Sequence, residues 1–181
     1  YKLKKKIGDK KGAANSLGNI GGAYSALKEH GKAIDYYNKA LELIPDEANV
    51  RTKSGILNNI GGIYIDLKDY DKALDYLNRA LKMRESGGDI RSLASSYGSL
   101  GRLYLMRKEH DQSIFYYNKS LEITQQVGLL RETRSGAYDL YQSYRKKGDN
   151  TKAVAMLELY VKMNDSVNSE RAKEEIIKQQ Y

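Results

Sequence analysis

Few side chains in this sequence have the types and spacing that catalysis or metal binding requires. His30 and His110 occupy the same position in two copies of a repeated pattern, so they are not placed as a metal pair or as a base beside its nucleophile. Gly18, Gly21 and Gly22 fall within a predicted helix and lack the following Lys and Ser/Thr of a phosphate-binding loop. The sequence has no cysteine, which excludes disulfides and thiolate metal sites. It therefore predicts no catalytic residue, no metal ligand and no cofactor.

Asn19 and Asn59 are better placed for binding than for catalysis. They stand at the same position in successive copies of the repeated pattern, each two residues before a glycine. An asparagine amide offers two donors and one acceptor, which suits the backbone of an extended peptide. Asparagine also tolerates a solvated helix face, and the sequence leaves the two interpretations open.

The elements that would position these side chains follow from a repeat with a period of 40 residues. A period of this size is typical of a solenoid built from one supersecondary unit. The repeated positions, copy by copy, are Leu17, Ile20, Gly21, Tyr24, Ala33, Tyr37 and Ala40; Leu57, Ile60, Gly61, Tyr64, Ala73, Leu77 and Ala80; Tyr97, Leu100, Gly101, Tyr104, Ser113, Tyr117 and Ser120; and Ala137, Leu140, Tyr141, Tyr144, Ala153, Leu157 and Tyr160.

Apolar residues within each copy recur at three- and four-residue spacing, which predicts two antiparallel amphipathic helices per copy. Acidic residues near the start of each second helix are expected to stabilise its free N–H groups and its dipole. These residues are Asp69, Asp71, Glu109, Asp111 and Asp149.

Glycines inside the first helices predict close helix crossings. Gly21, Gly61 and Gly101 each cost about 1 kcal/mol relative to alanine, so we expect a neighbouring helix to pass close to them, with small residues such as Ala73 opposite. The fourth copy has Tyr141 at this position and is expected to be an end repeat with a wider crossing. The tyrosines at the repeat positions are expected to pack in the core with their hydroxyls at its edge; they are Tyr24, Tyr64, Tyr104 and Tyr144.

The pattern predicts four repeats, at about 13–47, 51–87, 91–127 and 131–165. Residues 1–12 are expected to be the end of a preceding repeat helix and a turn. Residues 166–181 are expected to form a C-terminal helix that either caps the array or carries a signal.

The first copy resembles the tetratricopeptide repeat, through Leu17, Ile20, Gly21, Tyr24, Ala33, Tyr37, Ala40 and Pro45. The resemblance implies an all-α fold: a right-handed α–α superhelix of about four helix pairs plus a C-terminal helix. Because the family's usual unit is about 34 residues, the longer period resembles the variant found in bacterial sensor and signalling proteins.

The resemblance also implies a concave peptide-binding face on the first helices. Its candidate residues are Asn19, Asn58, Asn59, Arg102, Tyr138, Asp139, Gln142, Arg145 and Lys146. The Lys and Asn that hold a peptide carboxylate in part of the family are replaced by Gly18 and Gly22, so that clamp is not expected. Three of the candidates, Arg102, Arg145 and Lys146, are cationic and favour an acidic partner.

The charge distribution argues against nucleic acid as the partner. Of the net charge of +8, five charges lie in residues 1–12, and the repeats are close to neutral. No apolar run reaches the ~18–20 residues of a membrane span, and the N-terminal lysines precede no signal-peptide core. We therefore expect a soluble, non-catalytic module that binds a protein or peptide in a larger signalling protein, with no direct membrane contact. The alternative is a structural spacer or a homodimerisation module. The compartment stays open, with the cytoplasm favoured over the periplasm.

Overall fold

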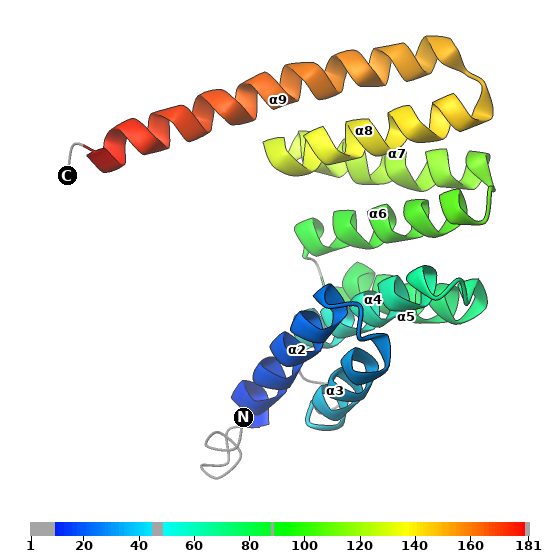
Figure 1. Cartoon of the computed structure of the whole chain (residues 1–181), viewed down its shortest axis with the longest axis vertical. Coiled ribbons are helices and arrows are strands. Elements are labelled where there is room, and N and C mark those ends of the chain that lie inside the picture. Colours follow the sequence, from blue (N-terminus) through cyan, green and yellow to red (C-terminus); the bar gives the residue numbers. More distant parts are fainter. Residues whose placement is uncertain (1–9, 45–48, 88, 180–181) are drawn as a thin grey trace. The chain divides into compact units, whose positions relative to one another are not determined.

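Every element in the part of the chain that the structure describes is an α-helix. The computed structural model describes residues 10–44, 49–87 and 89–179, with side chains as far as residue 171. Its helices, shown in Figure 1, are α2 (Lys10–Ala26), α3 (His30–Glu42), α4 (Val50–Asp66), α5 (Tyr70–Gly87), α6 (Ile90–Met106), α7 (His110–Gln126), α8 (Leu130–Lys147) and α9 (Asn150–Gln179). They form consecutive pairs, as the repeat pattern predicted.

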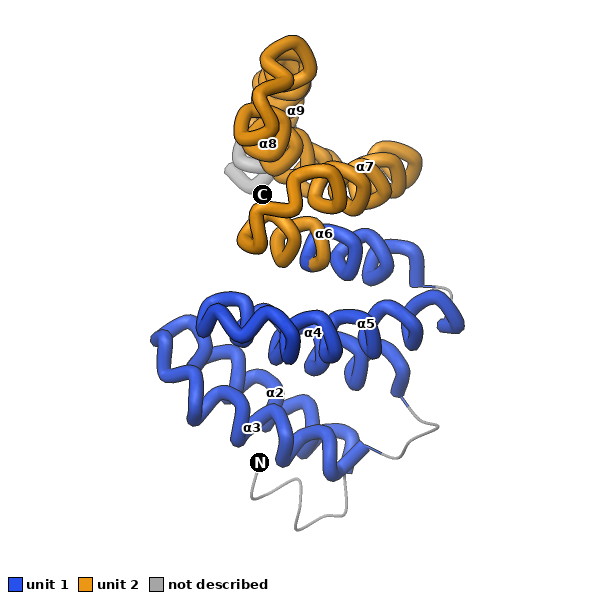
Figure 2. The backbone as a smooth tube through the Cα atoms, turned by 90° about the vertical axis from the view of Figure 1, so that its right-hand side faces the viewer, with its two compact units in different colours: residues 1–99 blue, residues 100–181 orange. Residues whose placement is uncertain are grey.

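The chain divides into two compact units, residues 1–99 and residues 100–181 (Figure 2). The border falls inside α6, so this helix contributes to both units.

The hinge between the two helices of each copy is the same motif, repeated four times. In the first copy, Lys28 adopts a left-handed conformation with φ of 61°, and the N–H of Glu29 donates to the carbonyl oxygen of Tyr24 at 2.9 Å. A hydrogen bond from an N–H to the carbonyl oxygen five residues earlier, next to a left-handed residue, defines a Schellman motif. This motif ends a helix by supplying hydrogen bonds to its last carbonyl groups. The equivalent left-handed residues are Lys68, Lys108 and Gly148.

The acids predicted at the starts of the second helices behave differently from one another. Asp69 Oδ1 accepts the backbone N–H of Lys72 at 3.3 Å, and Asp149 Oδ1 accepts that of Lys152 at 3.1 Å, as expected for N-terminal caps. Glu109 was predicted in the same role but makes no side-chain cap bond. Its carboxylate instead pairs with Arg107 Nε at 2.7 Å. Glutamate has one methylene more than aspartate, which places it outside the preferred capping residues.

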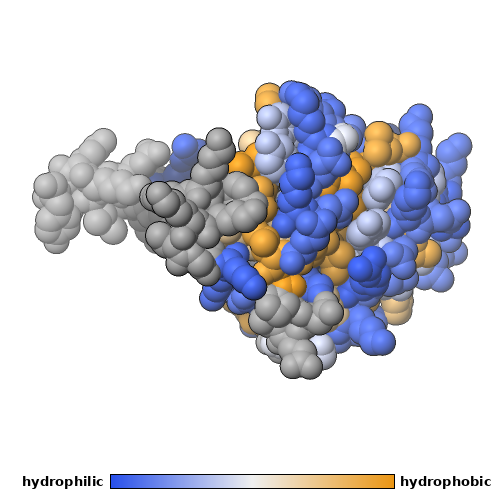
Figure 3. Space-filling model, turned by 90° about the horizontal axis from the view of Figure 1, so that it is seen from below, coloured by the Kyte–Doolittle hydropathy of each residue, from blue (hydrophilic) through white to orange (hydrophobic). Residues whose placement is uncertain are grey.

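The core of the first unit depends on the predicted glycines. A Cβ atom added at Gly21 would lie 2.9 Å from Tyr37 Cδ1, and one added at Gly61 would lie 2.7 Å from Leu77 Cγ. The closest neighbours are thus the large side chains of Tyr37 and Leu77, which fill the space that the glycines leave, while Ala73 lies farther away. Viewed from the side of α2 and α3, hydrophobic side chains emerge as a band between hydrophilic ones (Figure 3).

The second unit repeats this contact once and then departs from it. A Cβ atom at Gly101 would lie 2.7 Å from Tyr117 Cγ. In the fourth copy Tyr141 replaces the glycine, and Leu157, at the position of Tyr117, is 37% exposed, whereas Tyr117 is 3% exposed. The fourth copy therefore lacks the contact between a glycine and a buried large side chain that the other three copies share.

The repeat tyrosines are partly buried, and Tyr24, Tyr64 and Tyr144 pack against the core, in agreement with the prediction. Tyr24 stacks on Tyr36 with ring centroids 5.3 Å apart, and Tyr64 stacks on Tyr76 at 5.5 Å. Lysines cover the outer faces of these pairs, as Lys32 does at 5.2 Å from the Tyr24 centroid. Each stack joins the two helices of one copy near the hinge.

Two predicted boundaries are wrong. Helix α9 runs without a break from Asn150 to Gln179, so residues 166–179 continue the second helix of the fourth copy and do not form a separate helix. Residues 10–12 belong to α2, and Gly12 is buried in that helix, where we had expected a turn. The end of a preceding helix, predicted within residues 1–12, would fall on residues 1–9, which lie outside the described residues.

Candidate functional site

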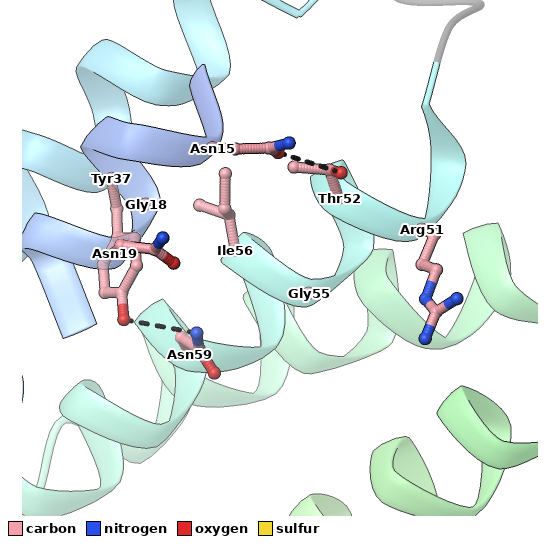
Figure 4. Close-up of a pocket in the computed structure, with 9 residues that line it drawn as sticks. All are labelled: Asn15, Gly18, Asn19, Tyr37, Arg51, Thr52, Gly55, Ile56 and Asn59. Atoms are coloured by element: carbon pink, nitrogen blue, oxygen red, sulfur yellow. Dashed lines mark hydrogen bonds between the residues drawn. The ribbon is translucent and has the colours of Figure 1, made fainter. Parts of the chain in front are cut away.

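A cleft of about 450 Å³ lies in the first unit between α2 and α4. We call it the Asn cleft (Figure 4); it is lined by Asn15, Gly18, Asn19, Tyr37, Arg51, Thr52, Gly55, Ile56 and Asn59. The first helices of two successive copies form its walls, and α3 contributes one residue, Tyr37. Helical spacing explains the lining, because Asn15 and Asn19 are one turn apart and Thr52, Gly55 and Asn59 follow one face of α4.

Tyr37 and Asn59 form the only side-chain pair in the cleft with a direct bond in the normal range. Asn59 Nδ2 donates to Tyr37 Oη at 3.2 Å (Figure 4). Burial raises the pKa of the Tyr37 hydroxyl, so this group stays protonated at neutral pH. Because Asn59 fills an acceptor position of the hydroxyl oxygen, the Tyr37 proton is left as a donor. The Asn59 carbonyl oxygen is in turn an acceptor beside it.

The other polar groups of the cleft keep most of their hydrogen-bonding capacity. Thr52 Oγ1 lies 3.5 Å from Asn15 Oδ1, which is at the limit of a hydrogen bond. Arg51 Nε pairs with Asp89 Oδ2 at 3.5 Å, while its side chain is 86% exposed. Asn19 is exposed, and none of the described residues bonds to its amide. The cleft is therefore rich in uncommitted amide and hydroxyl groups.

Two glycines give the cleft its open space. A Cβ atom at Gly55 would meet nothing within 4 Å, and one at Gly18 would lie 3.8 Å from Ile56 Cδ1. A side chain at Gly55 would thus extend into the cleft without touching the core. This geometry leaves room for a ligand at the helix surface.

In the second unit the same place carries a different chemistry. Tyr117 and Asp139 stand where Tyr37 and Asn59 stand in the first unit. Burial raises the pKa of Asp139 to about 6, and the nearby positive charge of Arg102 partly opposes this. Burial and the negative charge of Asp139 both raise the pKa of Tyr117. The charge predicted for Arg102 in a cationic groove is therefore offset by a neighbouring carboxyl group.

The remaining cationic candidates, Arg145 and Lys146, have other contacts. Arg145 Nη1 donates to Tyr141 Oη at 3.1 Å, and its guanidinium lies 5.6 Å from that ring centroid. Lys146 lines another hollow, of about 460 Å³, at the hinge between α6 and α7. That hollow mixes both charges; its other residues are Lys108, Glu109, His110, Asp111, Gln112 and Lys147. Lys146 thus lies at a surface of mixed charge.

The other predicted site residues have varied surroundings. Asn58 is partly buried, and its amide oxygen has no hydrogen-bond partner among the described residues. Tyr138 is 43% exposed and contacts the rings of Tyr141 and Tyr160. Gln142 is partly buried. A single face shared by residues of both units stays a prediction.

Sequence reasoning missed four polar residues of the cleft, Asn15, Tyr37, Arg51 and Thr52, and also Gly55 and Ile56. The sequence marked Tyr37 only as a repeat position; its residue is 2% exposed, yet its hydroxyl reaches the cleft. Asn15 and Thr52 could have been found from helical periodicity, since each lies on the same helix face as a predicted asparagine.

Comparison with known proteins identifies the repeats. Models of the tetratricopeptide repeat match residues 14–47 and residues 53–126. The chain belongs to the tetratricopeptide repeat family. Tetratricopeptide repeats are generally protein-binding modules without catalytic activity of their own. Comparison with curated protein sequences gives no match.

Solved structures support the tetratricopeptide fold at low sequence identity. BtubC (BKLC) from P. vanneervenii is 21% identical with a TM-score of 0.77, over 86% of this chain and 64% of that one. Aspartyl phosphate phosphatase F from Bacillus subtilis is 17% identical with a TM-score of 0.81, over 86% of this chain and 41% of that one. A Rap protein complexed with Competence and Sporulation Factor is 20% identical with a TM-score of 0.78, over 83% and 42%. The chain thus spans less than two thirds of each of these proteins.

Two further features bear on the kind of site the tetratricopeptide repeats carry. Among the described residues, no three His, Asp or Glu side chains are grouped as metal ligands would be. In the same part of the chain, no helix has the length and apolar character needed to cross a lipid bilayer.

Proposed function

We propose that the Asn cleft binds the backbone of an extended peptide segment, and that the chain is a non-catalytic, sensory or scaffolding module of a larger signalling protein. The observation that carries the proposal is the set of amide and hydroxyl groups around an open cleft: Asn15, Asn19, Asn59 and the Tyr37 hydroxyl. A peptide backbone alternates donors and acceptors, and asparagine amides supply both. The volume of about 450 Å³ is also within the range of ligand pockets.

The chemistry of the cleft favours backbone recognition over recognition of a charged group. Its one cation, Arg51, already faces Asp89. The amides and the Tyr37 hydroxyl are neutral, so affinity from this cleft depends little on ionic strength. An acidic partner for the arginines of the second unit is a separate proposal. The carboxyl group of Asp139 lies near Arg102 and offsets its positive charge, so the support for this second proposal is weaker. Among the similar structures, one holds a bound factor, which supports ligand binding by this type of fold.

The test uses the full chain and a displayed library of random dodecapeptides, from which binders are selected and synthesised with a fluorescent label. Asn19→Ala with Asn59→Ala should weaken binding at least tenfold, because several buried hydrogen bonds to the peptide are lost at about 1 kcal/mol each. Gly55→Leu should weaken binding to a similar extent, because its side chain fills the cleft.

The matched control is Gly31→Leu on α3, where an added Cβ atom also meets nothing within 4 Å and no cleft residue is involved. This variant should bind with the affinity of the unmodified chain. Selection of no peptide, or of peptides that Gly55→Leu binds equally well, would contradict the assignment of the cleft.

A further inference from the structure

A buried arginine in the first unit links three helices. Arg84 on α5 is 6% exposed. Its Nε donates to Ser54 Oγ on α4 at 3.2 Å, and its Nη1 donates to Ser96 Oγ on α6 at 2.8 Å and to the carbonyl oxygen of Ser92 at 2.6 Å. Burial lowers the pKa of the guanidinium, and the negative charge of Asp89 opposes this. Arg84 is thus the centre of a buried polar network, although it does not line the Asn cleft.

Other copies fill the position of Arg84 without a charge. It is held by Ile44, which packs in the apolar cluster of the first unit, and by Thr124, whose hydroxyl donates to the carbonyl oxygen of Leu121 in its own helix. Replacing a buried ion by well-packed apolar atoms is often neutral or stabilising, so the fold does not need a cation at this position. A buried polar network rigidifies the groups that it joins. The specific contribution of Arg84 is therefore a fixed geometry for the groups that it bonds.

On α4, those groups belong to the first turns of the helix. Ser54 Oγ accepts from Arg84 and donates to the carbonyl oxygen of Arg51 at 3.2 Å. Ser54 is 0% exposed, so this link runs from the core to the wall of the Asn cleft. Four residues of the same turns line the cleft (Figure 4): Arg51, Thr52, Gly55 and Ile56.

A second link reaches the cleft through the start of α6. Ser92, whose carbonyl oxygen accepts from Arg84, donates its backbone N–H and its hydroxyl to the Asp89 carboxylate at 3.3 and 2.7 Å. Asp89 Oδ2 pairs in turn with Arg51 Nε at 3.5 Å. Arg51 is therefore held at two places, at its backbone carbonyl through Ser54 and at its guanidinium through Asp89.

We propose that Arg84 is a positioning residue of the Asn cleft, which holds the first turns of α4, and the cleft groups that they carry, in place for a peptide. It acts through Ser54 and Asp89 and touches no peptide itself. A wall that is already ordered loses less conformational entropy when a ligand binds, so Arg84 raises the affinity of the cleft. This inference rests on the function proposed for the Asn cleft and adds a residue that lies outside it.

The test compares Ser54→Ala with Ser96→Ala, because each change removes one hydrogen-bond acceptor of Arg84 and both serines are 0% exposed. Of the two serines, Ser54 is the one that bonds to the Arg51 carbonyl oxygen. Labelled peptides selected on the unmodified full chain should bind Ser54→Ala weaker by about threefold or more, because the loosened wall must be ordered on binding. They should bind Ser96→Ala with unchanged affinity. Urea unfolding midpoints of the two variants should be lowered alike, which separates loss of positioning from loss of stability.

A double-mutant cycle tests whether Ser54 acts through Arg84. Arg84→Met should weaken binding of the same peptides at least as much as Ser54→Ala does. Ser54→Ala added to Arg84→Met should weaken binding no further, because the link is already absent.

Amide hydrogen exchange of the free full chain is a readout that needs no peptide. In Ser54→Ala, the amides of Gly55 and Ile56 should exchange faster by about threefold or more relative to those of Ile63 and Tyr64, near the other end of α4, because the first turns open locally more often. In Ser96→Ala this ratio of rates should be that of the unmodified chain.

Unchanged peptide affinity or an unchanged exchange ratio in Ser54→Ala would overturn the proposal, and so would equal effects of Ser96→Ala. If no peptide were selected, the function proposed for the cleft would fail. The exchange ratio would then decide by itself whether Arg84 fixes the first turns of α4.

Discussion

Replacing Gly61 and Gly62 by alanine, one at a time, should have opposite effects on stability although the two positions are adjacent on α4. At Gly61 the new Cβ atom would lie 2.7 Å from Leu77 Cγ and 2.8 Å from Leu77 Cδ2, distances that require a shift of a fully buried side chain. At Gly62 it would meet nothing within 4 Å. Both changes gain the same helix propensity, about 1 kcal/mol. The difference between them therefore isolates the cost of overpacking.

We expect Gly62→Ala to raise the free energy of unfolding by about 0.5–1 kcal/mol. Gly61→Ala should lower it by up to ~2 kcal/mol, because overpacking a dense core costs about 1–3 kcal/mol against the same propensity gain. The measurement is the midpoint of urea unfolding of the full chain, followed by far-UV circular dichroism.

A double-mutant cycle with Leu77→Ala tests the cause. Leu77→Ala removes the atoms that the new Cβ would meet, so Gly61→Ala in that background should become neutral or stabilising. The coupling energy between the two positions should be about 1–3 kcal/mol. If Gly61→Ala and Gly62→Ala shifted the midpoint equally, or if the cycle showed no coupling, the packing account of the repeat glycines would be wrong.

Three further changes test the hinge, the buried arginine and the buried carboxyl group, each by urea unfolding. Lys68→Gly should stabilise by up to about 1 kcal/mol because Lys68 has a φ of 62°, whereas Lys72→Gly, inside α5, should destabilise by about 1 kcal/mol. Arg84 is 6% exposed, and its guanidinium donates to Ser54 Oγ, the carbonyl oxygen of Ser92 and Ser96 Oγ. Arg84→Ala should therefore lower the free energy of unfolding by about 3 kcal/mol or more. Arg84→Met should lower it less, because methionine refills the volume. The pKa of Asp139 is raised to about 6 in the folded state, so its contribution to stability is present at pH 4 and is lost as the pH rises through 6. Asp139→Asn should remove this pH dependence. At pH 7 it should raise the free energy of unfolding by on the order of 2–3 kcal/mol.

The fold was predictable because the period places the same side chains in the same contacts. The sequence predicted close helix crossings at Gly21, Gly61 and Gly101. Glycine is unfavourable inside a helix, so its presence there indicates that another residue packs against it. The partner of each contact was not predictable. Spacing identified Tyr37, Leu77 and Tyr117 as repeat positions. It could not show that their side chains, and not the small residues of the second helices, fill the space over the glycines.

The hinges and the buried arginine show where sequence reasoning fails for a physical reason. Lysine is not a residue that favours a left-handed conformation, yet Lys28, Lys68 and Lys108 adopt it because the Schellman bonds on both sides fix the turn. Arg84 occupies the position held by Ile44 and Thr124 in other copies, and a charged residue there predicts a solvated face. Its burial depends on two serines and a carbonyl from other segments of the first unit, which no single helix pattern contains.

Part of the candidate site could be predicted from the repeats, and part could not. Asn19 and Asn59 could be predicted because they stand at the same position in successive copies. The cationic groove was predicted from charge alone. In the structure, Arg102, Arg145 and Lys146 each have different partners or surroundings. At equivalent places the first unit has an amide bonded to a phenol, and the second has a carboxyl group beside a phenol. The phenol is the same in both places, and the group beside it is Asn59 in one and Asp139 in the other; other cleft positions differ as well, as Thr52 does from Glu132. An array of this kind can therefore change its specificity copy by copy while its fold, which depends on the glycines and the hinges, stays the same.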